Sequence, residues 1–146
     1  MIEHDMVNNM KFYPNTKYSI LSNDDKFKNF KGVLKGTSNK LVEINDVKMT
    51  LNHLILIKDR WVVAREYADE IIDGSFEVYD FVDIDDTNSY VSGGLVHHNC
   101  QTGEQLVHVY DTKLDKKLDV SFEELRQMII LDNLGLDYQE VKFFNV

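Results

Sequence analysis

The chain has 146 residues and a mass of 17.0 kDa, with 43% hydrophobic and 28% charged residues. This length suits one packed domain, so residues 1–146 are expected to form a single domain. With 16 basic against 25 acidic residues, the net charge is −9, which offers no basic face to nucleic acid or to an anionic membrane. One cysteine excludes an internal disulfide, and no apolar run suggests a membrane span or a signal peptide. We therefore expect a soluble protein of a reducing, cytoplasmic compartment.

The first half of the chain has the pattern of short strands separated by polar turns. Residues 1–15 are weakly patterned and end as extended chain that enters a turn at Pro14. The pair Asn45-Asp46 lies between two apolar runs and predicts a hairpin, and residues 36–39 predict a turn. The predicted strands are residues 18–21, 27–33, 40–44, 47–50, 54–57 and 61–64. The predicted fold is mainly β.

The second half adds further strands and the clearest helix. Residues 65–72 predict a short helical turn that Asp73-Gly74 would end. Ser121 followed by Glu124 has the spacing of a capping box, and the apolar face after it predicts a helix over residues 122–132. The remaining predictions are strands at residues 76–84, 89–96 and 106–110, a turn at residues 85–88 and a polar connection at residues 111–117.

The reactive side chains concentrate in residues 93–100, Gly-Gly-Leu-Val-His-His-Asn-Cys, which contain the single cysteine of the chain. A thiol can attack a carbonyl, and an asparagine carboxamide can attack its own backbone carbonyl. An imidazole can carry the protons that both reactions move. Cys100, Asn99 and His98 are therefore candidates for cutting or rearranging a peptide bond.

Three motifs, at residues 50–53, 78–81 and 96–100, resemble the splicing motifs of inteins in their sequence and in their order along the chain. Residues 96–100, Val-His-His-Asn-Cys, resemble the C-terminal splice junction, where a His and an Asn precede a nucleophile. Residues 50–53, Thr-Leu-Asn-His, resemble the intein Thr-x-x-His motif, and residues 78–81, Val-Tyr-Asp-Phe, resemble the strand that holds the catalytic Asp of the family. The resemblance implies a Hint fold, a horseshoe-like β fold with pseudo-two-fold symmetry and one or two short helices, and a reaction without cofactor or metal.

The opening motif of an intein occurs after these motifs and not before them. Residues 100–125 are similar to an intein start, in which Cys-x-x-Gly precedes a strand and a charged turn leads to a short helix. The chain thus resembles a circularly permuted intein, with the C-terminal segment, residues 1–99, placed before the N-terminal segment, residues 100–146. Residues 17–32 resemble the atypically split inteins of phage-type proteins. The implied partners are flanking extein polypeptides and, in the natural split form, the complementary intein segment.

The resemblance implies roles in thioester formation for five residues. Cys100 would attack the preceding carbonyl, and His53 would protonate the departing amide nitrogen. Thr50 or Asn52 would hydrogen-bond the amide or its oxyanion, and Asp80 would tune the cysteine. A thiol is only partly ionised near neutral pH, so a neighbouring base is needed.

The resemblance also implies how the bond after Asn99 breaks. Asn99 would close on its own carbonyl to a succinimide with the help of His98, and His97 would be a neighbour without a direct role. The further His of the family near Asp80 corresponds to Asn88 here, which removes one proton relay. Because both reactive residues share the bond Asn99–Cys100, the permuted chain can at most cleave that bond.

Four alternatives remain open at this stage. A hedgehog-type autoprocessing domain would form the thioester without Asn cyclisation, and His98-Asn99 argues against it. A non-catalytic, acidic, β-rich binding module would stay intact. An intein whose residues 101–146 are ordinary extein needs a lost first motif. A zinc site has suitable donors but lacks ordinary ligand spacing. Its candidate ligands are His53, His97, His98 and Cys100.

Overall fold

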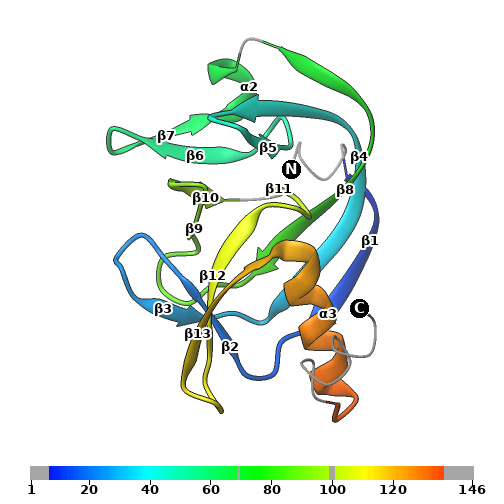
Figure 1. Cartoon of the computed structure of the whole chain (residues 1–146). Helices are drawn as coiled ribbons and strands as arrows, with labels where there is room; N and C mark the ends of the chain where they lie inside the picture. The colour runs from blue at the N-terminus through cyan, green and yellow to red at the C-terminus, as the bar shows by residue number, and fades with distance from the viewer. Residues whose placement is uncertain (1–6, 69, 99–100, 137–146) are drawn as a thin grey trace.

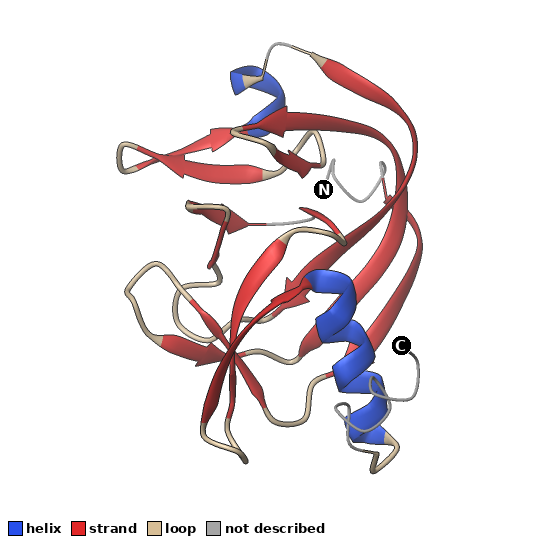
Figure 2. Cartoon of the chain, viewed as in Figure 1, coloured by secondary structure: helices blue, strands red, loops and turns tan. Residues whose placement is uncertain are grey.

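The computed structural model describes residues 7–68, 70–98 and 101–136. These residues form a mainly β structure with two short helices and a partly closed, barrel-like sheet (Figures 1 and 2). The prediction of a mainly β fold with one or two short helices is confirmed, and the architecture is compatible with a Hint-like fold. Neither of these two helices has the length and apolar character that crossing a membrane requires. The elements are β1 (Val7–Pro14), β2 (Tyr18–Leu21), β3 (Phe27–Asn29), β4 (Gly32–Ile44), β5 (Val47–Met49), β6 (Leu54–Ile57), β7 (Arg60–Val63), α2 (Ala64–Tyr67), β8 (Ile71–Val82), β9 (Tyr90–Ser92), β10 (Leu95–His98), β11 (Gln101–Thr102), β12 (Leu106–Asp111), β13 (Lys116–Ser121) and α3 (Phe122–Asn133).

The strands form three antiparallel sheets. One has the order β1-β4-β5-β11-β8, with β4 also paired to β8, and the others have the orders β7-β6-β10-β9 and β13-β12-β2-β3. The long strands β4 and β8 run side by side along one edge of the molecule (Figure 1). β10 and β11 lie between the β6–β7 hairpin at one end and the β2, β3, β12 and β13 sheet at the other (Figure 1). His98 and Gln101, the described residues nearest to the Asn99–Cys100 bond, thus lie in the middle of the fold.

Local sequence explains the best-predicted elements. Asn45 and Asp46 both have positive φ, 52° and 65°, which two-residue hairpin turns need in order to match the twist of their strands. The predicted hairpin between β4 and β5 is therefore confirmed. The predicted helix is also confirmed as α3, because the Ser121 hydroxyl accepts the Glu124 N–H at 3.0 Å and caps its first turn.

Two local predictions are wrong, and both failures have the same cause. Residues 36–39 are not a turn but part of β4, which instead has an irregular register between Ser38 and Lys40. Asp73-Gly74 does not end a helix, because α2 stops at Tyr67 and both residues lie within β8. Pairing between β4 and β8 supplies backbone hydrogen bonds along both strands, and this non-local gain outweighs the local turn preference of Gly and Asp.

Some strand boundaries also differ from the predicted ones. The predicted strand over residues 27–33 is two strands, β3 and β4, which belong to different sheets. The predicted polar connection over residues 111–117 is shorter, because β13 begins at Lys116 and pairs with β12 as a hairpin. Residues 7–14 form β1, an antiparallel partner of β4 with a register shift between Asn8 and Lys11, although their sequence is weakly patterned.

The main hydrophobic core is shared between the parts of the chain before and after the reactive stretch. β12 pairs with β2, with Val109 opposite Ile20, and both side chains are fully buried. Residues 101–136 are therefore part of the same body and not a detached tail. The core residues from the first part are Tyr18, Ile20, Phe30, Val33, Tyr79, Phe81, Ile84 and Tyr90, and those from the second part are Val107, Val109, Val120, Phe122, Leu125, Met128 and Ile129.

An ion pair with little solvent exposure also joins the two parts. Lys17 Nζ lies 3.1 Å from Asp111 Oδ2, and the two side chains are 16% and 4% exposed. Asp111 Oδ1 additionally accepts the N–H groups of Lys113 and Leu114 at 3.0 Å each. The carboxylate thus holds both the turn after β12 and the chain that enters β2.

We expect Asp111→Ala to lower the free energy of unfolding by about 3 kcal/mol. It leaves two backbone N–H groups without their acceptor, and it leaves the largely buried Lys17 ammonium with only the more distant Asp132 carboxylate, at 3.7 Å. Asp73→Ala is the matched control. Asp73 pairs with Lys40 at 2.7 Å, but these side chains are 75% and 48% exposed, so its loss should stay within about 0.5 kcal/mol. Urea unfolding followed by circular dichroism measures both losses, and equal losses would contradict the role given to Asp111.

Candidate functional site

Residues 50–53 form a tight turn between β5 and β6. The His53 N–H donates to the Thr50 carbonyl oxygen at 3.1 Å, and the His53 carbonyl accepts the Ala64 N–H at 2.8 Å. The side chains of Thr50 and His53 are fully buried, whereas Asn52 is half-buried. The apolar cluster around Met49, Leu51 and Ile55 packs beneath the turn and fixes its place in the fold. The Thr-x-x-His spacing therefore closes one hydrogen-bonded turn and buries its two ends.

The strands that flank residues 99 and 100 pair with both sides of this turn. In the β10–β6 pair, His98 lies opposite Leu54, the residue that follows His53. In the β11–β5 pair, Gln101 lies opposite Met49, the residue that precedes Thr50. Asn99 and Cys100 themselves lie outside the described residues. Their neighbours on both sides nevertheless lie beside the turn that carries His53.

β8 also passes next to this region. Gln101 lies opposite Tyr79 in the β11–β8 pair, and Tyr79 is followed directly by Asp80. Successive residues of a strand face opposite sides, so the side chains of Tyr79 and Asp80 point to opposite faces of β8. Tyr79 is buried in the main core, whereas the half-buried Asp80 lines a cavity of about 190 Å³.

Two imidazoles make a buried pair at the turn. His53 Nε2 lies 2.7 Å from His97 Nδ1, and His97 Nε2 lies 2.7 Å from the Ser92 carbonyl oxygen. Both rings have no solvent-exposed surface, and the ring of Tyr90 stacks on His97 with a centroid distance of 5.5 Å. The sequence led us to expect no direct role for His97, but the structure places it in contact with His53.

Burial determines the charge of His97. Loss of solvent lowers the pKa of His97 to about 4, although the hydrogen bond to the Ser92 carbonyl partly opposes this effect. The ring is therefore neutral at pH 7. A neutral imidazole has one donor and one acceptor nitrogen, so each of its two contacts has a fixed direction.

His98 faces the cavity that Asp80 lines, together with Asn88. Asn88 Nδ2 lies 3.0 Å from His98 Nε2. An amide nitrogen can only donate, so Nε2 accepts and the neutral ring carries its proton on Nδ1. Trp61 adds an edge-on contact to the same ring, with a centroid distance of 6.3 Å. Asn88, which stands where the resemblance to inteins would place a further His, is thus a direct partner of His98.

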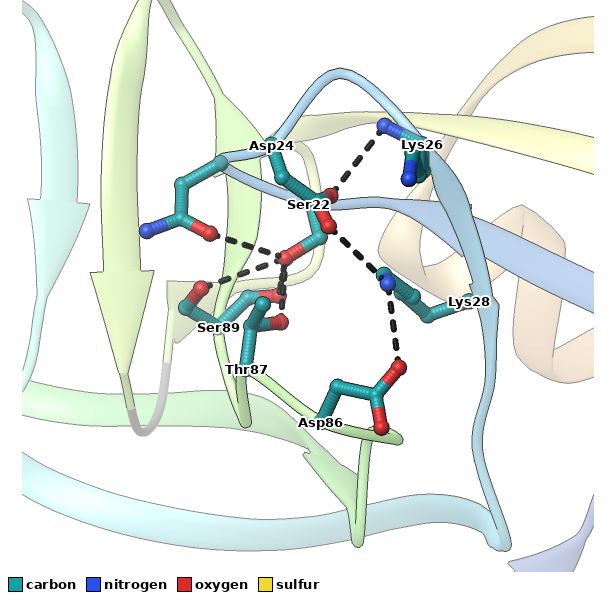
Figure 3. Close-up of polar contacts among 8 residues, drawn as sticks. Ser22, Asp24, Lys26, Lys28, Asp86, Thr87 and Ser89 are labelled. Carbon is teal, nitrogen blue, oxygen red and sulfur yellow. Dashed lines mark hydrogen bonds and ion pairs between the residues drawn. The ribbon is translucent and has the colours of Figure 1, made fainter.

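A network of hydroxyl groups anchors the turn that carries Asn88 (Figure 3). The buried Ser22 hydroxyl donates to the Ser89 carbonyl oxygen at 2.9 Å and also contacts the hydroxyl groups of Thr87 and Ser89. Asn88 itself has a φ of 51°, a left-handed conformation that Asn adopts more readily than most residues. The loop between β2 and β3 therefore helps to hold Asn88 over His98.

Lys28 reinforces this anchor from the protein surface (Figure 3). Its ammonium lies 2.9 Å from Asp24 Oδ2, within the β2–β3 loop, and 3.1 Å from Asp86 Oδ2, within the turn before Asn88. The ammonium group of Lys28 thereby links the two loops, although exposed pairs of this kind contribute little stability.

The structure thus groups the sequence-predicted residues on two sides of β10. Thr50 and His53 lie on the buried side, where His97 joins them. Asp80 and His98 line the cavity on the other side, where Asn88 joins them. Asn52 is half-buried in the turn, and Asn99 and Cys100 fall outside the described residues.

The described part of the chain contains no group of three or more His, Cys, Asp or Glu side chains arranged to hold a metal ion. Cys100, one of the four candidate zinc ligands, lies outside that part. Two of the other three, His53 and His97, use nitrogen atoms for a hydrogen bond to each other.

Comparison with known proteins identifies no relative. Neither a family model, nor a curated protein, nor a solved structure matches the chain. The functional interpretation therefore depends on the motifs and on the geometry of the site.

His97 should make the stability of the protein depend on pH. Its pKa is about 4 in the folded state against an ordinary value of 6.5, so the unfolded chain binds this proton more readily. The contribution of His97 to the free energy of unfolding should be constant above pH 6.5, fall by about 3 kcal/mol as the pH drops to about 4, and stay constant below that.

Replacing His97 by Gln removes this titration while keeping a donor and an acceptor. In a chain with Asn99→Ala and Cys100→Ala, which lacks both expected cleavage routes, we expect His97→Gln to reduce the fall in unfolding free energy between pH 6.5 and 4 by about 3 kcal/mol. His108→Gln on β12, where His108 contacts Asp119 at the surface, is the control. Urea unfolding at a series of pH values gives the comparison, and an unchanged slope for His97→Gln would refute the assignment.

Proposed function

We propose that the chain is an intein in circularly permuted order, a self-processing domain that rearranges the peptide bond Asn99–Cys100. The pairing of β10 and β11 with opposite ends of the Thr50–His53 turn supports this proposal most strongly. It brings the described residues next to this bond beside a buried imidazole to which the resemblance to intein motifs assigns proton transfer. The described parts of the three motifs, which are separate in sequence, are thus carried by neighbouring elements.

The first step of the proposed mechanism is an N-to-S acyl shift. Cys100 Sγ attacks the Asn99 carbonyl carbon, the C–N bond breaks, and the thiol proton ends on the freed amine of Cys100. His53 acts as the general acid for that nitrogen, and Thr50 or Asn52 hydrogen-bonds the carbonyl oxygen as charge develops on it. Asp80 tunes the thiol. The step needs a reduced cysteine, which suits the cytoplasm.

The second reaction is cyclisation of Asn99, which in this permuted chain starts from the intact amide and is an alternative to thioester formation at the same bond. The side-chain nitrogen of Asn99 attacks its own backbone carbonyl carbon, forms a succinimide and expels the amine of Cys100, which takes a proton from the attacking nitrogen. His98 assists this transfer from the cavity side of β10. Because Asn88 donates to Nε2 of His98, the proton of the neutral ring lies on Nδ1, and this is the proton that His98 would transfer.

In the natural order, transthioesterification between these steps would transfer one extein to the nucleophile of the other. The proposed partners are accordingly extein polypeptides and, for a split form, segments equivalent to residues 1–99 and 100–146. These segments carry net charges of −5, from 11 basic and 16 acidic residues, and −4, from 5 basic and 9 acidic residues. Their association must therefore come from the shared apolar core and not from opposite net charge.

The rival functions make different chemical predictions. A hedgehog-type domain would form the thioester but would not cyclise Asn99, and a binding module would do neither. The interpretation of residues 101–146 as ordinary extein is disfavoured because β12, β13 and α3 together supply seven of the fifteen residues of the main core.

Cleavage of the intact chain tests the proposal. We expect breakage only at Asn99–Cys100, which gives a 99-residue fragment ending in succinimide or Asn and a 47-residue fragment that begins with Cys. Asn99→Ala should abolish the succinimide route and keep thiol-induced cleavage, and Cys100→Ala should do the reverse. Mass spectrometry with and without dithiothreitol follows both products. A chain that stays intact in both conditions would support a binding module.

The two histidines should affect different routes. We expect His98→Ala to slow Asn cyclisation and His53→Ala to slow thiol-induced cleavage, each by about 10²–10⁴-fold, because each would remove a general acid or base. The cleavage rates are measured separately in the Cys100→Ala and Asn99→Ala backgrounds. If either substitution slowed both routes equally, the assignment of His98 to Asn cyclisation and of His53 to thioester formation would be wrong.

Separating the segments tests the ligation activity. A segment of residues 1–99 followed by a foreign sequence that begins with Cys, mixed with residues 100–146 preceded by another foreign sequence, should join the two foreign sequences under reducing conditions. The added Cys is the nucleophile that accepts the acyl group from Cys100. Asn99→Ala in the first segment is the control, because it removes the final release. If the segments fold together on mixing but yield no joined product, an autocleaving domain becomes the better interpretation.

A further inference from the structure

We propose that His97 is a positioning residue that holds His53 as the Nε2–H tautomer, so that Nδ1 is the atom through which His53 exchanges protons with the reacting amide. The proposal rests on the proposed function, which gives His53 its role as general acid. The motif of the splice junction assigns no task to the residue at this position. The evidence is the direction of two hydrogen bonds in a fully buried site.

The direction of both hydrogen bonds follows from the Ser92 carbonyl oxygen, which is the acceptor at the end of the chain His53–His97–Ser92. The Ser92 carbonyl oxygen can only accept, so the hydrogen bond of 2.7 Å from His97 Nε2 requires the proton of His97 on Nε2. His97 is neutral, and its Nδ1 therefore has a lone pair and must accept. His53 Nε2 lies 2.7 Å from that lone pair, so His53 must donate with an Nε2–H. The backbone of β9 thereby determines the tautomer of a ring two hydrogen bonds away.

The fold fixes the carbonyl that begins this chain of hydrogen bonds. Ser92 ends β9, and Gly93 and Gly94 turn the chain into β10 with positive φ values of 59° and 75°. A Cβ atom at Gly93 would lie 2.5 Å from Val47 Cγ2, so the turn also needs glycine for space. The Ser92 hydroxyl donates to the Leu106 carbonyl at 2.5 Å and thus ties the hairpin to β12.

The tautomer of His53 affects its function because the two rings are fully buried and have no solvent to hydrogen-bond. Without an acceptor, a buried Nε2–H costs roughly 1–3 kcal/mol, and the ring would lower this cost by moving the proton to Nδ1 or by rotating. Either change would take the basic nitrogen away from its working position. When His53 carries a second proton on Nδ1, the neutral His97 still accepts from Nε2–H, so the contact persists in both protonation states that a general acid must visit.

Paired substitutions separate positioning from packing. Gln at position 97 offers an oxygen acceptor for His53 and an N–H donor for Ser92, whereas Phe fills a similar volume with neither. In the Asn99→Ala background, we expect His97→Phe to slow thiol-induced cleavage by about 10–100-fold, which is less than the loss of His53 itself, and His97→Gln to retain most of the rate. His108→Phe and His108→Gln on the surface of β12 are matched controls and should change neither rate.

A measurement on the unsubstituted pair keeps the test independent of folding defects. In the full chain with Asn99→Ala and Cys100→Ala, imidazole ¹⁵N chemical shifts and long-range ¹H–¹⁵N correlations should assign the Nε2–H tautomer to both His53 and His97. In the His97→Phe chain, the His53 signals should shift toward the Nδ1–H tautomer or average between the two.

Two results would overturn the proposal. One is an Nδ1–H tautomer at His53 in the unsubstituted chain. The other is a His97→Phe chain that cleaves as fast as its parent while His53→Ala remains slow, which would leave the proposed function intact. If the Asn99→Ala chain with native His97 never cleaves with thiol, the proposed function fails instead, and the tautomer assignment is decided separately by the spectra.

Discussion

The hydrogen bond between His53 and His97 is the constraint on which the rest of the site depends. Two imidazoles that are fully buried and 2.7 Å apart cannot both be charged, because each charge would lack solvent and repel the other. One proton must lie between them, and the Ser92 carbonyl decides which ring donates it. The Thr50–His53 turn, the glycine turn before β10 and the packing of Tyr90 all serve to keep these three groups in line.

β10 gives neighbouring residues separate tasks. Because side chains alternate along a strand, His97 faces the buried turn while His98 faces the cavity with Asp80 and Asn88. A strand that carries both side chains keeps the two proton-transfer groups at a fixed spacing. It also shields His53 from the solvent that reaches the cavity. In the proposed mechanism, this separation lets thioester formation and Asn cyclisation use different bases at one peptide bond.

Local sequence predicted the elements whose structure depends on neighbours along the chain. The Ser121 cap, the Asn45-Asp46 turn and most short strands belong to this group. The lengths of β4 and β8 could not be predicted in the same way, because the residues that look like turns are held by a strand about forty positions away. The sequence similarly identified the reactive residue types but not their partners. His97 was missed because its importance comes from a ring in the Thr50–His53 turn, and because the predicted strand ended at residue 96, before the two histidines of β10.

The shared core explains how such a chain could work when its order is changed. The main core combines residues of β2, β8 and β9 with residues of β12, β13 and α3, so neither part can complete its hydrophobic core alone. The bond from Ser92 to the Leu106 carbonyl extends this dependence to the site, because it joins the hairpin that orients His97 to a strand of the other part. Association of the two parts would thus complete the core and align His53 in a single event. This coupling would keep a separated segment chemically inactive until its partner is bound, whichever end of the chain carries the break.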